Sequence, residues 1–175
     1  MIREVDTGDL KEKIEGWKEQ LKNRFVESEV ERAKRRAGRF VDEYVPEYFR
    51  GILLSSERLR EVFFLYIAIY LLKKEGYELS YLNRHPIAET GAKMRLIGSL
   101  YRLLYFFEEV EKSAISTLEN ELLQYDDLPK DIIRKIQITA NMLTTLYLQH
   151  DPRKGGDPAE LYKIIDNYIR RHWLK

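Results

Sequence analysis

The sequence predicts an all-α protein, a compact bundle of about five to six helices. No long stretch alternates apolar and polar residues with a period of two, no hairpin turn sequence is present, and apolar residues recur at helical spacings in every long segment. The 175 residues are 44% hydrophobic and 34% charged, which fits a soluble domain with a real core. We expect one helical domain over residues 1–175, with 1–27 as a candidate N-terminal extension and 157–175 as an extra C-terminal helix.

Two helices are predicted before the first proline of the chain. The first begins at Asp9 and ends near Asn23. The second begins near Ser28, a good N-cap residue, and must end by Pro46, because proline disfavours helical geometry in the residue before it. The apolar stripe that turns the second helix toward a core consists of Val26, Val30, Ala33, Ala37, Phe40 and Tyr44.

The third helix is expected to start at Ser55 or Ser56 and to stop at Gly76, a typical C-terminal glycine. A loop of about nine residues follows, and Pro86 then fits the first turn of a fourth helix, where its missing N–H costs little. That fourth helix is expected to run to about Gln124.

Two further helices complete the predicted bundle. The fifth opens at residues 127–129 and ends near His150. The last is capped by Asp157, has Pro158 in its first turn and carries Glu160 at the capping-box position.

Two of these helices are apolar over most of their circumference. The third contains the run 62–72, VFFLYIAIYLL. Such a helix is buried on several sides, which favours a central helix wrapped by the others; the alternative is that one side faces another subunit. The corresponding residues of the fifth helix are Ile132, Ile133, Ile136, Ile138, Met142, Leu143, Leu146 and Tyr147.

Four arginines form a row on the second predicted helix. Their spacing of i, i+3, i+4 and i+7 places them along one side, as fixed cations suited to a polyanion such as a nucleic-acid backbone. The alternative is a solvated face with local ion pairs between Glu31 and Arg35 and between Arg39 and Glu43. The row consists of Arg32, Arg35, Arg36 and Arg39.

The overall charge and the cysteine count restrict the function classes. A net charge of +1 means that a nucleic-acid binder must sort its cations onto one face or share the contacts with partners. The absence of cysteine excludes disulfides, thiolate metal sites and cysteine nucleophiles, and it fits a reducing compartment. The polar start resembles no signal peptide, and the run 62–72 is too short to span a membrane, so we expect a cytoplasmic protein without membrane contact.

No catalytic constellation is recognisable. The histidines His85, His150 and His172 lack the i, i+4 spacing of a helical metal pair, and no nucleophile elbow, Walker loop or dinucleotide fingerprint occurs. The segment 153–156, RKGG, precedes a helix and could bind phosphate, but a plain turn is favoured. We therefore expect a protein that is not an enzyme and has no metal or cofactor.

Two segments carry a resemblance to a known family. Residues 54–60, LSSERLR, resemble the motif that opens a helix in the small subunit of type III-A (Csm) CRISPR effector complexes. Residues 78–82, ELSYL, and 89–93, ETGAK, resemble a second stretch of that family, although Ala92 stands where the family has arginine and Lys93 would take its place. Near the C-terminus, the pairs Leu161-Tyr162 and Trp173-Leu174 look more like the Cmr-type small subunit.

The resemblance implies a non-catalytic small subunit of an antiviral ribonucleoprotein that stacks along a guide RNA–target RNA duplex. It implies contacts with RNA phosphates and with other effector subunits, and self-association is left open. The alternative is a helical adaptor that binds only protein in a replication, repair or transcription assembly. The candidate RNA-binding residues are Arg60, Lys93, Arg58, Arg84 and Arg95, together with the row of Arg32, Arg35, Arg36 and Arg39.

Overall fold

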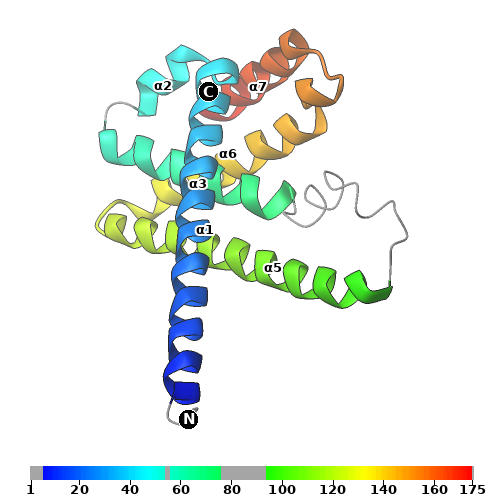
Figure 1. Ribbon diagram of the computed structural model, residues 1–175. Coiled ribbons are helices and arrows are strands. Elements are labelled where there is room, and N and C mark those ends of the chain that lie inside the picture. The colour runs from blue at the N-terminus through cyan, green and yellow to red at the C-terminus, as the bar shows by residue number, and fades with distance from the viewer. Residues whose placement is uncertain (1–5, 54–55, 76–93, 175) are drawn as a thin grey trace.

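The computed structural model describes residues 6–53, 56–75 and 94–174, and within α5 it describes side chains from residue 105 onward (Figure 1). This part of the chain contains helices and no strand, which confirms the predicted all-α class. The α-helices are α1 (Asp6–Tyr44), α2 (Glu47–Leu53), α3 (Glu57–Glu75), α5 (Met94–Leu122), α6 (Lys130–Gln149) and α7 (Pro158–Trp173), with short 3-10 turns at Leu123–Tyr125 and Pro152–Lys154.

Helix α3 lies at the centre of the bundle, in contact with α1, α2, α5 and α6 (Figure 1). Its buried side chains point in several directions; Val62, Phe63 and Ala68, which lie on different sides of the helix, are each at most 1% exposed. The predicted central helix is therefore confirmed for the third helix. Across the described residues, no helix combines the length and the apolar character needed to cross a membrane.

Helix α1 is continuous where two helices were predicted. Asn23 and Ser28, interpreted as an end and a cap, both lie inside it, and it also runs through the boundary at residue 27. The prediction of a break was wrong, because asparagine and serine are tolerated within a helix and no proline lies between residues 6 and 44. The predicted end was confirmed, since α1 stops at Tyr44, two residues before Pro46.

The short helix α2 was not predicted from the sequence. Its first turn is closed by the carbonyl of Pro46, which accepts hydrogen bonds from the N–H groups of Phe49 (3.1 Å) and Arg50 (3.2 Å). Phe49 and Leu53 are spaced by four residues and both are buried, so α2 covers one end of the core.

The predicted caps of α3 and α7 are present. The Ser56 hydroxyl accepts a hydrogen bond from the N–H of Leu59 at 3.4 Å. The Asp157 carboxylate accepts one from the N–H of Ala159 at 3.0 Å, and Pro158 occupies the first turn of α7. Pro86 and Gly76 lie outside the described residues.

Helix α6 differs from its prediction. Ile136, Ala140 and Leu143 are fully buried, but Ile138 is 52% exposed and Met142 is 39% exposed. The fifth helix is therefore one-sided and not wrapped by its neighbours within the described part of the chain.

The C-terminal helix α7 is fixed to α2 by a polar contact. The Tyr48 hydroxyl donates a hydrogen bond to Asp166 at 2.5 Å, and Arg170 pairs with the same carboxylate while lying 4.9 Å from the Tyr48 ring centroid. Burial, with the hydrogen bond to Asp166, raises the pKa of Tyr48 to about 12. This contact and the buried row of Leu161, Ile165 and Ile169 make α7 part of the same bundle.

Candidate nucleic-acid interface

The arginine row lies on the part of α1 that is anchored in the bundle. Val30, Ala33, Ala37 and Phe40 are at most 7% exposed, and Val26 and Tyr44 pack against the same core. This confirms the predicted apolar stripe. Because the stripe holds α1 against α3 and α5, the arginines project from a rigid helix and not from a loop.

The four arginines differ in their surroundings. Arg32, Arg35 and Arg39 are exposed, whereas Arg36 is half-buried and has contacts of its own. Arg32 lies 3.8 Å from the carboxylate of the buried Glu29, a loose ion pair. Arg35 and Arg39 are therefore the two exposed arginines of the row without a carboxylate partner in the described part of the chain.

The local ion pairs of the alternative interpretation do not form among the described residues. Within the described ranges, no carboxylate lies within ion-pair distance of Arg35 or Arg39, although Glu31 and Glu43 are one turn away from them. Lys34, which directly precedes Arg35, is held by Glu121 of α5 at 2.9 Å. The lysine thus ties α1 to α5, while the two arginines keep their charges free for a ligand.

Arg58 has a structural role at the start of α3. Its guanidinium donates two 2.5 Å hydrogen bonds to Asp127 and one of 3.1 Å to the Gln124 carbonyl, and it lies over the Tyr125 ring. The hydrogen bond lowers the pKa of Asp127 and raises that of Arg58, since each favours the charged form of the other. Arg58 therefore joins α3 to the segment after α5, and binding RNA would have to compete with this pair.

Of the remaining candidate RNA-binding residues, the structure describes some and not others. Arg60 is half-buried and lies 5.3 Å from the Phe64 ring centroid, a cation–π contact along α3. Arg95 lies in the first turn of α5, with a side chain outside the described set. Lys93 and Arg84, and with them the segments 78–82 and 89–93, lie outside the described residues.

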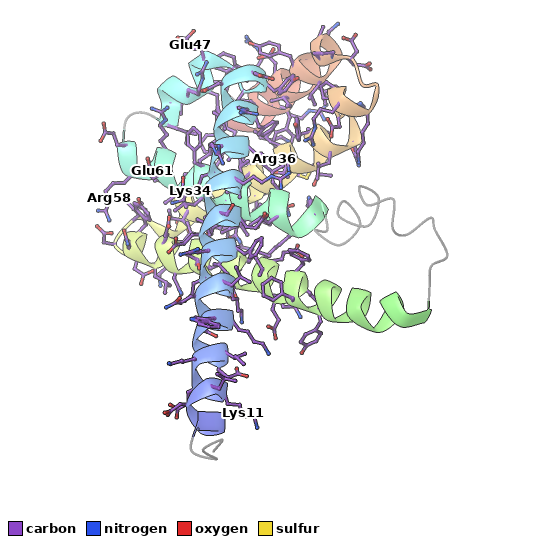
Figure 2. All side chains as sticks on the ribbon, in the orientation of Figure 1. Lys11, Lys34, Arg36, Glu47, Arg58 and Glu61 are labelled. Atoms are coloured by element: carbon purple, nitrogen blue, oxygen red, sulfur yellow. The ribbon has the colours of Figure 1, made fainter. Side chains whose placement is uncertain are left out.

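The described cations do not gather in a single patch. Figure 2 shows Arg58 at the outer end of α3, well separated from Arg36 on α1. The row on α1 and the start of α3 are thus two separate basic surfaces of the described bundle.

A groove of about 400 Å³ at the start of α6 was not anticipated from the sequence. Its lining includes Lys130, Arg134 and Gln137 of α6, Val62 and Tyr66 of α3, and Asp126, which adds a negative charge. The i, i+4, i+7 spacing of Lys130, Arg134 and Gln137 was the sequence signal that could have revealed this groove.

The segment 153–156 forms the plain turn that was favoured over a phosphate loop. The Asp151 carboxylate accepts hydrogen bonds from the Arg153 backbone N–H (2.9 Å) and from its guanidinium (2.9 Å). Gly155 adopts a left-handed conformation with φ +92°, and the N–H of Gly156 returns to the Asp151 carbonyl at 3.0 Å. Arg153 is therefore directed toward its own turn.

Asp151 makes the stability of this turn sensitive to acid. Burial acts to raise the pKa of Asp151, but the hydrogen bonds from Arg153 outweigh it and leave the pKa below its ordinary value. The native state thus binds this proton more weakly than the unfolded chain, so stability is present above the unfolded pKa of about 4 and is lost as the pH falls through the native pKa. We expect the free energy of unfolding, measured with urea, to fall between about pH 5 and about pH 2.

The matched variant for this prediction is Asp151→Asn, which keeps an oxygen to cap Arg153 and removes the titrating group. Its unfolding free energy should depend less steeply on pH in the same range. Equal slopes for the two proteins would assign the acid sensitivity to other carboxylates.

No cluster of three or more histidine, aspartate or glutamate side chains suited to a metal occurs among the described residues. No protein-family model, curated protein or solved structure matches the chain. The function therefore has to be proposed from the fold, the exposed charges and the sequence motifs.

Proposed function

We propose that the chain is a non-catalytic small subunit of a type III CRISPR effector complex, which stacks along the guide RNA–target RNA duplex and contacts its phosphates. The observation that carries this proposal is the anchored helix α1, with the accessible guanidinium groups of Arg35 and Arg39 one turn apart. Exposed guanidinium groups on a rigid helix provide a contact with phosphates that needs no particular base sequence.

The geometry of the row suits a polyanion. At 1.5 Å per residue, Arg32 and Arg39 lie about 10 Å apart along the axis of α1, so the row can follow a backbone across more than one phosphate. Arginine also matches phosphate oxygens with its planar fork of donors.

The family resemblance adds a second support. Residues 54–60, which resemble the Csm motif, lead into α3, and Arg60 follows the Ser56 cap in its first turns. Arg60, Arg58, Lys93, Arg84 and Arg95 remain candidates for RNA contact on the strength of this resemblance, although Arg58 is paired with Asp127.

The near-neutral net charge supports a subunit that works in an assembly. A lone protein of net charge +1 attracts nucleic acid weakly, but neighbours in a complex can share the phosphate contacts. The exposed apolar residues Ile138 and Met142 on α6 offer surface for such neighbours.

The test is to remove two charges from the row. In the complex purified from its host with the variant chain, Arg35→Gln with Arg39→Gln should weaken association with its RNA. The slope of log affinity against log salt concentration should become shallower by roughly 1.5 to 2, because about two phosphate contacts are lost. A filter-binding titration at several salt concentrations measures both quantities.

The control removes two exposed charges elsewhere, with Lys163→Gln and Arg171→Gln on α7. These changes should leave affinity and slope as in the original protein. If the α1 variant also keeps both, or if no discrete short RNA copurifies with the chain, the proposed RNA contact is wrong.

The alternative, a helical adaptor that binds only protein, is favoured by the exposed apolar side chains of α1 and α6. It predicts that nuclease treatment leaves all copurifying partners attached. For an effector subunit, degradation of the RNA should release partners that are joined to the chain through the duplex.

A further inference from the structure

The N-terminal part of α1 projects from the bundle (Figure 1). All residues from Gly8 to Leu21 are exposed, and the first contacts with the bundle are the ion pair of Lys22 with Glu109 at 3.5 Å and the packing of Phe25 on Phe106. Figure 2 shows Lys11 near the free end, well away from Arg36 in the anchored part. We call residues 8–21 the α1 arm.

One side of the arm is an apolar seam without a partner among the described residues. Its residues are separated by four, three and four positions, which is the a and d spacing of a coiled coil. A row of large apolar side chains exposed to water on one side of a helix indicates an interaction surface. Because this row is narrow, it matches the width of a second helix better than that of a broad apolar surface. The seam consists of Leu10 (59% exposed), Ile14 (39%), Trp17 (66%) and Leu21 (51%).

The charges around the seam are sorted by sign. In the heptad set by the seam, the flanking e and g positions hold Lys11, Lys13, Lys18 and Gln20, so every charge beside the seam is positive. The glutamates Glu12, Glu15 and Glu19 fall on the outer side of the arm. None of the three lysines has an ion-pair partner in the described part of the chain.

This pattern opposes pairing of the arm with a second copy of itself. In a parallel pair, Lys13 would face Lys18 of the other copy; in an antiparallel pair, the e-position lysines would face each other. Like charges at these positions are destabilising and select against such a partner. A partner helix with an apolar seam and acidic flanking residues would cover the apolar side chains of the arm and also pair with its lysines.

We propose that the α1 arm is a docking site for a partner protein helix, which pairs with it as a two-stranded coiled coil. The partner carries apolar residues at its a and d positions and glutamate or aspartate at its e and g positions. The inference goes beyond the proposed RNA contacts and does not depend on them, since Arg35 and Arg39 lie outside the arm.

The arm by itself is a weak helix. It spans 14 residues, close to the shortest length at which isolated helices persist in water, and Gly16 lies in its interior, where a Cβ would meet nothing within 4 Å beyond the helix's own backbone. A partner that covers the seam therefore adds the packing the arm lacks. We expect amide hydrogen exchange in residues 8–21 to slow when the partner binds.

The binding test uses the full chain and two labelled three-heptad peptides with leucine at a and d. One peptide has glutamate at every e and g position, and the other has lysine there. Fluorescence anisotropy should show binding of the glutamate peptide and not of the lysine peptide. Trp17→Ala should weaken the binding roughly thirtyfold, as expected for a central tryptophan of an interface. The matched control, Glu12→Ala with Glu19→Ala on the outer side, should not weaken it.

A charge reversal tests the specificity. The triple variant Lys11→Glu, Lys13→Glu and Lys18→Glu should bind the lysine peptide and lose the glutamate peptide. Three outcomes would overturn the proposal: neither peptide binds, the reversal leaves the preference unchanged, or sedimentation shows a dimer of the chain that Trp17→Ala dissociates. A fourth is binding of phosphatidylcholine–phosphatidylglycerol vesicles through Trp17 without peptide binding, which would make the arm a membrane contact.

Discussion

Replacing Trp173 with alanine is expected to lower the free energy of unfolding by about 3 kcal/mol, the lower end of the range for buried aromatic residues. The indole joins three helices: its N–H donates a hydrogen bond to Thr139 of α6 at 3.0 Å, and its ring lies 5.0 Å from that of Phe49 of α2. Lys135 adds a cation–π contact at 4.3 Å. The substitution removes all three contacts and leaves a void at the end of the core. Thermal unfolding should therefore shift downward by about 6–12 °C.

The chain contains its own control for this change. Trp17 on the α1 arm is 66% exposed, so Trp17→Ala should leave the unfolding transition almost unchanged. Trp173→Phe keeps an aromatic ring beside Phe49 but loses the hydrogen bond to Thr139, for an expected cost of about 1 kcal/mol. Equal melting temperatures for the two tryptophan-to-alanine variants would contradict the role of Trp173.

The elements that could be predicted from the sequence are those with local signals. Ser56 and Asp157 accept hydrogen bonds from the first turns of α3 and α7, as their positions indicated. The end of α1 followed from Pro46, whose effect on the preceding residue is steric and needs no tertiary contact. Such signals act within a few residues and therefore hold before the chain is packed.

The errors occurred where local signals are permissive. Asn23 and Ser28 are compatible with a helix boundary and also with a helix interior, and the packing of residues 25–41 on α3 and α5 favours continuity. The short helix α2 depends on burial of Phe49 and Leu53, which only the assembled core provides. For the same reason, the exposed side of α6 could not be distinguished from a buried one by composition.

The candidate site also contains features that could be predicted from the sequence and features that could not. The row of arginines and its apolar counterpart share one helix, so the periodicity of that helix was enough to place Arg35 and Arg39 on the surface. The pairing of Arg58 with Asp127 joins residues 69 positions apart, and the groove beside Lys130 is lined by residues of α3, α5, α6 and the segment between α5 and α6. The pairing of Arg58 with Asp127 is set by packing and leaves no periodic trace in the sequence, whereas the groove shows there only as the i, i+4, i+7 spacing of its α6 residues.

The second large effect is expected for Gly156→Ala, which should cost about 2–3 kcal/mol of unfolding free energy. A Cβ at this position would lie 2.2 Å from the His150 carbonyl oxygen and 2.6 Å from its carbon. Both are backbone atoms, and the Gly156 N–H is already bonded to the Asp151 carbonyl, so the turn cannot move aside without losing that bond. Chemical denaturation of the variant at neutral pH measures the loss.

A substitution of the neighbouring Gly155 distinguishes the cost of this clash from the cost of backbone strain in the loop. A Cβ at Gly155 would meet nothing within 4 Å, so Gly155→Ala should cost only the strain of its left-handed φ of +92°, about 1 kcal/mol. Gly16→Ala on the arm should be neutral or slightly stabilising, because alanine favours a helix and the site is open. If Gly156→Ala were no more harmful than Gly155→Ala, the close approach of residue 156 to His150 would be wrong.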